Sequence, residues 1–90
     1  MLVDFKTVEV RTLEGEILPD IHKTVGNLIY RFTKDLGMVA VAEKIYAGET
    51  VDLDKTELQE VERLLSNPQS GLFAFVRKAL GDYVQTLRKG

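Results

Sequence analysis

The sequence has 90 residues, of which 44% are hydrophobic and 29% charged, and its formal net charge is −2. This length has room for a single domain over residues 1–90, and the composition excludes a disordered chain. The absence of cysteine excludes a disulfide scaffold, thiolate catalysis and thiolate-bound zinc. The small net charge gives no general reason to expect nucleic acid or acidic lipid as a partner.

No secretory or membrane-spanning segment is predicted. Asp4 and Lys6 interrupt the apolar start that a secretory signal would need. The longest uncharged stretch, residues 64–76, contains Pro68, Gly71 and several polar residues, so it cannot form a span of about 20 apolar residues. We therefore expect a soluble, cytoplasmic protein without a membrane partner.

The chain is predicted to be of α+β class, with an N-terminal β-hairpin at about residues 2–19. Residues 2–12 are rich in the β-branched and aromatic side chains that are typical of a strand. Their alternation changes phase near Thr7, which indicates either a bulge or a strand buried on both faces. A turn around Gly15, which can adopt a positive φ, leads to a short second strand that Pro19 limits to a sheet edge. This exposed strand could pair with a strand of another chain.

About four helices are predicted to follow in the same compact domain, over about residues 23–88. The first carries an apolar stripe from residue 25 to residue 36, with Gly37 as its C-terminal cap. The second is predicted over residues 38–47, and Gly48 closes it in the same way.

The third helix is predicted to begin after Asp54, because its carboxylate can accept from the N–H of Glu57 while Glu57 reaches back. The proline at position 68 ends this helix, since the residue before a proline is pushed out of the helical region. The last helix is predicted to run from about Pro68 or Ser70 to about Arg88.

Two glycines fall inside predicted helices. Gly26 either marks a close-packing point or delays the helix start to Asn27, and we favour the packing interpretation. Gly81 costs about 1 kcal/mol relative to alanine, a cost that the close approach of another helix would offset.

No catalytic, cofactor or metal site is predicted, and neither is a small-molecule substrate. His22 is the single histidine, and the two serines, Ser66 and Ser70, have no nucleophile-elbow pattern around them. The acidic cluster within residues 49–57 lacks the glycine-centred spacing of a calcium loop, and no glycine pattern forms a phosphate-binding loop. We therefore expect that the protein is not an enzyme.

Charge is unevenly distributed along the second half of the chain. Residues 49–62 carry six acidic residues and one basic residue, whereas residues 63–90 carry five basic residues and one acidic residue. Acids at a helix start and bases at a helix end complement the helix dipole, which explains much of this pattern. The remaining hypothesis is association, in which the acidic third helix meets the basic fourth helix of a neighbouring molecule.

The run of residues 72–76 is apolar on all sides, although a surface helix needs a polar face there. Either this turn is buried centrally, or Phe73 or Phe75 meets a partner, since aromatic side chains are common interface anchors. The chain is expected to self-associate through this last helix. The candidate interface residues are Phe73, Phe75, Arg77 and Tyr83.

Four short stretches within residues 13–65 are considered together. They are the Glu-Gly-Glu turn at residues 14–16, Val-Gly-Asn-Leu-Ile-Tyr at 25–30, Lys-Ile-Tyr-Ala-Gly-Glu at 44–49, and Val-Asp-Leu leading to Glu57. With these stretches the chain resembles small uncharacterised proteins encoded in bacterial prophages. The resemblance implies a small phage- or mobile-element-associated protein that acts as an assembly or interaction component. It carries over no catalytic or ligand-binding residue.

The leading hypothesis is a non-enzymatic protein–protein interaction module that binds a protein partner, chiefly a second copy of itself. The alternative is a DNA-binding regulator with a helix-turn-helix in residues 38–65. The segment between its two helices is long for a turn of three or four residues. Its recognition helix would also carry Glu57, Glu60 and Glu62, which DNA phosphates repel.

Overall fold

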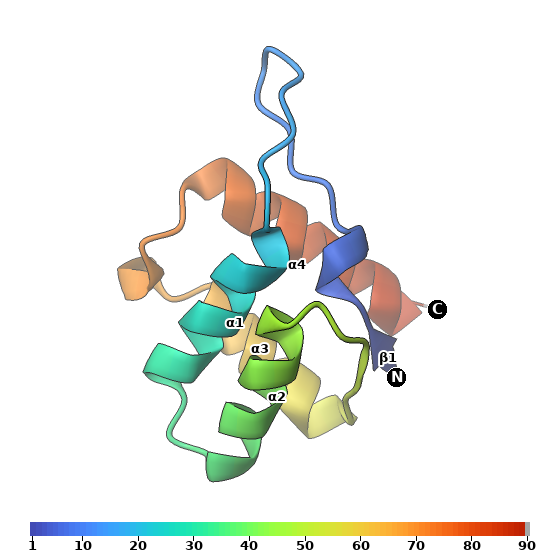
Figure 1. Cartoon of the computed structure of the whole chain (residues 1–90), viewed down its shortest axis with the longest axis vertical. Coiled ribbons are helices and arrows are strands. Elements are labelled where there is room, and N and C mark those ends of the chain that lie inside the picture. The colour runs from blue at the N-terminus through green and yellow to red at the C-terminus, as the bar shows by residue number, and fades with distance from the viewer. Residues whose placement is uncertain (90) are drawn as a thin grey trace.

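Four α-helices enclose a common core in the computed structural model, which describes residues 1–89 (Figure 1). The helices are α1 (Ile21–Phe32), α2 (Leu36–Tyr46), α3 (Lys55–Leu65) and α4 (Ala74–Lys89). Two short strands, β1 (Leu2–Val3) and β2 (Val51–Asp52), and two 3-10 turns, η1 (Phe5–Thr7) and η2 (Pro68–Ser70), complete the order of elements. The predicted class, α+β with an N-terminal hairpin and four helices, is confirmed.

The first strand pairs with a segment far along the chain. In the antiparallel pair of β1 and β2, Val3 lies opposite Val51 and Leu2 opposite Asp52. The N-terminal ammonium of Met1 extends this pairing, because it donates to the carbonyl of Leu53 at 2.7 Å. The start of the chain is thereby held against the segment that leads into α3.

The prediction of one long strand over residues 2–12 is wrong. The strand β1 ends at Val3, and β pairing returns only at the isolated bridge of Arg11. The carboxylate of Asp4 accepts from the N–H of Lys6 at 3.0 Å and so stabilises the turn η1. This turn lies where a bulge was expected, and it allows Phe5 and Val10 to be buried together with Val3. The irregular alternation of apolar residues thus reflects a 3-10 turn.

The predicted hairpin is present and projects from the helical body (Figure 1). Arg11 and Ile17 form an antiparallel bridge, and the N–H of Leu18 donates to the carbonyl of Val10 at 2.9 Å. Gly15 has a φ of +88° at the turn, which an L side chain rarely adopts. We call residues 10–18 the hairpin below.

The two glycines predicted to end helices behave differently. Gly37 does not cap α1; it lies in the first turn of α2, where its N–H donates to the carboxylate of Asp35 at 2.8 Å. Gly48 does end α2, with a φ of +83°. Its N–H donates to the carbonyl of Ile45, and the next N–H donates to that of Lys44, as in a Schellman motif.

The predicted cap of α3 is confirmed. Asp54 accepts from the N–H of Glu57 at 2.8 Å, and Glu57 accepts from the N–H of Asp54 at 3.0 Å. Leu53 and Leu58, which flank this box, are both buried. The last helix starts later than predicted, because residues 68–70 form the separate turn η2, which ends at a glycine of positive φ.

The core receives apolar side chains from all four helices and from the N-terminal segment. A Cβ at Gly26 would lie 2.8 Å from the Cβ of Tyr46 and 2.9 Å from the carbonyl oxygen of Ala42, so close packing of α1 on α2 is confirmed there. At Gly81, by contrast, a Cβ would meet no atom within 4 Å. The close approach of another helix that was suggested for Gly81 is therefore not found within residues 1–89. Across the described part of the chain, none of the helices has the length and hydrophobicity needed to cross a bilayer.

Candidate interaction surface

Two phenylalanine rings lie exposed at the start of α4. Phe73 retains 72% of its accessible surface and Phe75 retains 43%. Their rings stack almost in parallel, with centroids 6.1 Å apart and 7° between the ring planes. The apolar run at residues 72–76 is therefore neither wholly buried nor wholly exposed. Val76 is buried in the core, whereas the two phenylalanines are exposed to solvent.

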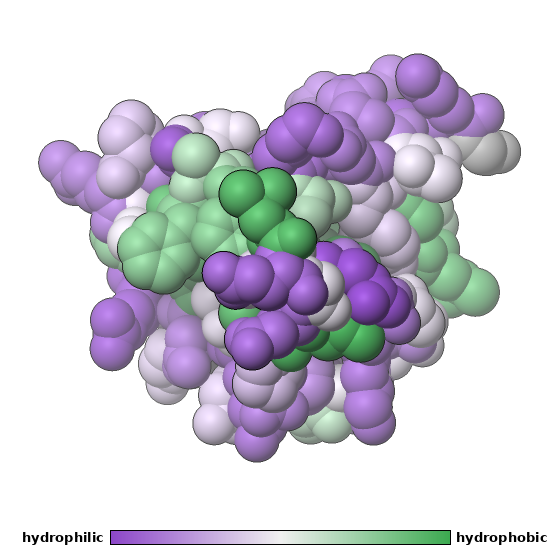
Figure 2. All heavy atoms as spheres, turned by 90° about the horizontal axis from the view of Figure 1, so that it is seen from above, coloured by the Kyte–Doolittle hydropathy of each residue, from purple (hydrophilic) through white to green (hydrophobic). Residues whose placement is uncertain are grey.

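A shallow groove lies beside these rings. It is lined by the base of the hairpin, with Leu18 and Pro19, and by the segment that leads into α4, with Leu72 and Phe73. Figure 2, seen from the hairpin end, shows a band of hydrophobic side chains bordered by polar ones on this side of the molecule. We call the set Leu18, Pro19, Leu72, Phe73 and Phe75 the apolar surface.

Arg77 lies one helical turn after Phe73 and is half-buried. Its Nε is shielded from solvent and finds no hydrogen-bond acceptor within residues 1–89. A buried donor without an acceptor is costly. The terminal nitrogens of the same half-exposed side chain form no ion pair within residues 1–89.

Tyr83 is already engaged within the chain. Its hydroxyl bonds to the backbone of Asp4, and its ring lies 5.5 Å from that of Phe5. The structure therefore separates the four predicted interface residues. Phe73 and Phe75 are exposed, Arg77 lies at their side, and Tyr83 faces the N-terminal segment.

The acidic and basic helices meet inside one molecule. Arg88 of α4 forms an ion pair with Glu62 of α3, and Gln85 Nε2 donates to the same carboxylate at 3.5 Å. Within α3, the hydrogen bonds from Arg63 hold the pKa of the Glu60 carboxyl below its ordinary value. The charge asymmetry is thus used at least in part for intramolecular packing of α3 on α4.

The residues weighed for chemistry lie apart. His22 is half-buried beside Gly48 at the end of α2. Asp52 pairs with the N-terminal ammonium at 2.9 Å, whereas Asp54 and Glu57 cap α3. Within residues 1–89, no three histidine or acidic side chains are grouped so that they could hold a metal ion.

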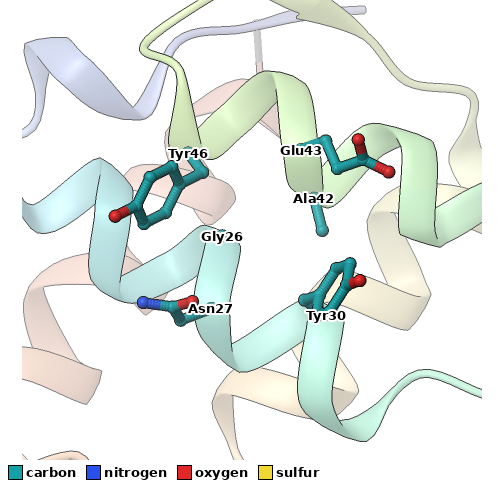
Figure 3. Close-up of a pocket in the computed structure, with 6 residues that line it drawn as sticks. All are labelled: Gly26, Asn27, Tyr30, Ala42, Glu43 and Tyr46. Carbon is teal, nitrogen blue, oxygen red and sulfur yellow. The ribbon is translucent and has the colours of Figure 1, made fainter.

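Sequence reasoning missed an open groove between α1 and α2, flanked by Tyr30 and Tyr46 (Figure 3). Tyr46 falls on the apolar stripe of its helix by spacing, yet it is 44% exposed. The sequence feature that could have indicated this groove is Gly26. A close crossing of two helices at a glycine leaves the longer side chains on either side of the glycine to form the walls of a groove.

No protein-family model, no curated protein and no solved structure matches this chain. The apolar surface at the start of α4 and the groove between α1 and α2 are thus the features from which a function can be proposed.

Proposed function

We propose that this chain is a non-enzymatic protein-interaction module that self-associates through the apolar surface at the start of α4. The observation that carries this proposal is the exposed, stacked pair of Phe73 and Phe75 next to a groove of apolar lining. Single exposed apolar residues are normal on a protein surface, but a contiguous patch that includes two aromatic rings is typical of an interface.

A second copy fits this surface because the protruding ring and the groove lie side by side. A two-fold axis brings the same patch of both protomers together, so a residue of one protomer meets a neighbouring residue of the other. Phe73 of each protomer would then enter the groove between Leu18 and Leu72 of its partner. Burial of a large aromatic side chain contributes about 1.5–3 kcal/mol, and two such anchors act at once in a symmetric pair.

The polar neighbourhood is compatible with this arrangement. The net charge of −2 gives little long-range repulsion between copies. The half-exposed guanidinium of Arg77, which forms no ion pair within the described residues, would donate through its terminal nitrogens to a carbonyl or carboxylate of the second copy.

The wider setting belongs to the same proposal. The resemblance of residues 13–65 to small prophage proteins supports an assembly or interaction component of a phage or mobile element, acting in the cytoplasm. Capsid or tail genes next to this one would support that setting, and their absence from the surrounding genes would count against it.

DNA binding is the alternative, and it has less support. Residues 47–54, including β2, separate α2 from α3, whereas a helix-turn-helix has a turn of about three or four residues. Glu57, Glu60 and Glu62 of α3 are all half-exposed, and DNA phosphates repel these carboxylates. A change in the electrophoretic mobility of duplex DNA when the protein is added at low salt would support this alternative.

The test is the solution mass by light scattering over a range of concentrations. The wild type is expected to exceed the monomer mass of 10.1 kDa, and Phe73→Ser is expected to be monomeric. Residue 73 precedes the first residue of α4, where serine is a favourable N-cap, so this variant should still fold.

The matched control is Leu36→Ser, which removes an 88% exposed apolar side chain at the start of α2. It should leave the mass unchanged. A wild type that is monomeric at every concentration, or an equal loss of mass in both variants, would overturn self-association through the apolar surface.

A further inference from the structure

The crossing of α1 on α2 creates an open groove with a floor of small residues. Gly26 and Ala42 form this floor, and the groove has a volume of about 430 Å³. Asn27 and Tyr30 of α1 and Glu43 and Tyr46 of α2 surround it (Figure 3). None of these residues belongs to the apolar surface at the start of α4.

Three of the four larger side chains in the walls of the groove, those of Asn27, Tyr30 and Glu43, make no ion pair, cation–π contact or side-chain hydrogen bond within residues 1–89, whereas the ring of Tyr46 is contacted by Lys23. Tyr30 is 56% exposed and Tyr46 is 44% exposed. The carboxylate of Glu43 forms no ion pair with any residue of the range 1–89, and the side-chain amide of Asn27 makes no hydrogen bond there. Two aromatic faces, one free carboxylate and one amide oxygen therefore surround the same space.

This chemistry favours a cation. An apolar ligand would remove Glu43 and Asn27 from water without replacing their hydrogen bonds, and an anion would be repelled by the carboxylate. Aromatic rings attract cations through the negative charge of their faces. One ring already shows this behaviour, because the ammonium of Lys23 lies 5.7 Å from the centroid of the Tyr46 ring.

A guanidinium fits better than an ammonium. It is planar, stacks on aromatic rings, is weakly hydrated and presents five N–H donors in a fixed fork. The two oxygens of Glu43 can accept a pair of these donors, as in bidentate arginine–carboxylate contacts. The Asn27 carbonyl and the two tyrosine hydroxyls provide further acceptors.

We propose that this groove binds an arginine side chain presented by a protein partner. The guanidinium lies in the groove against Tyr30 and Tyr46, where it takes the place of the Lys23 ammonium at the Tyr46 ring, and it pairs with Glu43. This site is independent of self-association, since it lies on α1 and α2 and shares no residue with the apolar surface.

The experiment is a titration with N-acetyl-arginine amide, in which binding is monitored through the NMR signals of the rings of the three tyrosines. The signals of Tyr30 and Tyr46 are expected to shift saturably, and those of Tyr83, which is held at the N-terminal segment, are expected to stay. The neutral isostere N-acetyl-citrulline amide should bind at least about fivefold more weakly, because it cannot form the charged pair.

Variants locate the site. Glu43→Gln is expected to weaken binding by about fivefold, whereas Glu14→Gln, which removes an exposed acid at the hairpin tip, should have no effect. Both side chains are exposed, so both variants should fold. Phe73→Ser should bind the probe like the wild type, which separates a failure of this proposal from a failure of self-association.

Several results would overturn the proposal. They are equal binding of the citrulline and arginine probes, an unchanged affinity in Glu43→Gln, and the absence of a saturable shift at Tyr30 and Tyr46. Tighter binding of free arginine than of its blocked amide would show that the groove takes the amino acid itself, and would also overturn a peptide-borne ligand.

Discussion

The hydroxyl of Tyr83 bonds to both backbone groups of Asp4. It accepts from the N–H at 2.9 Å and donates to the carbonyl at 3.1 Å, across 79 positions of the chain. The ring of the same tyrosine packs on Phe5. This contact fastens the turn η1 to α4 and so joins the N-terminal segment to the helix that carries the apolar surface.

Tyr83→Phe is expected to destabilise the protein by about 1–3 kcal/mol, since two partly buried backbone groups lose their partner while the ring remains. Urea denaturation gives the free energy of unfolding. Tyr30→Phe is the control, because the hydroxyl of Tyr30 lies on an exposed ring. The urea midpoint of this variant should equal that of the wild type. Equal stability of Tyr83→Phe and the wild type would show that these two hydrogen bonds contribute nothing net.

The two helical glycines should respond in opposite directions to substitution by alanine. Gly26→Ala forces a Cβ to within 2.8 Å of the backbone and Cβ of Tyr46, so a loss of about 1–3 kcal/mol or more is expected. Gly81→Ala adds a methyl group to open space in a helix, so a gain of up to about 1 kcal/mol is expected.

Thermal or urea unfolding of the two variants tests this contrast under identical conditions. A stabilised Gly26→Ala would contradict the close approach of α1 and α2. A destabilised Gly81→Ala would mean that a surface from a second molecule already occupies the space beside that glycine.

Two signals that act within a few residues were readable from the sequence, whereas the helix end predicted at Gly37 was wrong. The capping box of Asp54 and Glu57 and the glycine cap at Gly48 each involve groups within one or two helical turns. The residue types there have a single satisfactory arrangement, so the pattern predicts the geometry.

Contacts between distant segments were not readable. The pairing of Val3 with Val51 involves strands of two residues each, which leave no periodic pattern. The ion pair of Glu62 with Arg88 required knowledge that α3 and α4 pack against each other. For the candidate site, the sequence singled out Phe73 and Phe75, but whether they face the core or solvent depends on where α4 begins.

Removal of the α3 cap should be measurable. Asp54→Ala is expected to cost about 1 kcal/mol, because the N–H of Glu57 loses its acceptor at the helix start. Asp54→Ser keeps an oxygen at this position and should recover most of the loss. Chemical denaturation of the two variants tests this, and equal stability of Asp54→Ala and the wild type would argue against a stabilising box.

The pair of Glu60 and Arg63 makes a prediction about pH. The hydrogen bonds from Arg63 lower the pKa of Glu60 from its ordinary value of 4.5. The stabilisation from this pair is therefore present above about pH 4.5 and is lost as the pH falls through the folded pKa. In Arg63→Gln, the pKa of Glu60 should rise, as followed by the NMR shift of its carboxyl carbon. An unchanged titration would contradict the pairing.

Contacts between two copies can be observed directly by NMR in a sample that mixes isotope-labelled and unlabelled chains. Self-association through the apolar surface predicts intermolecular NOEs from the ring of Phe73 to the methyl groups of Leu18 and Leu72. Intermolecular NOEs that map to another face, or their absence at every concentration up to the solubility limit, would contradict it.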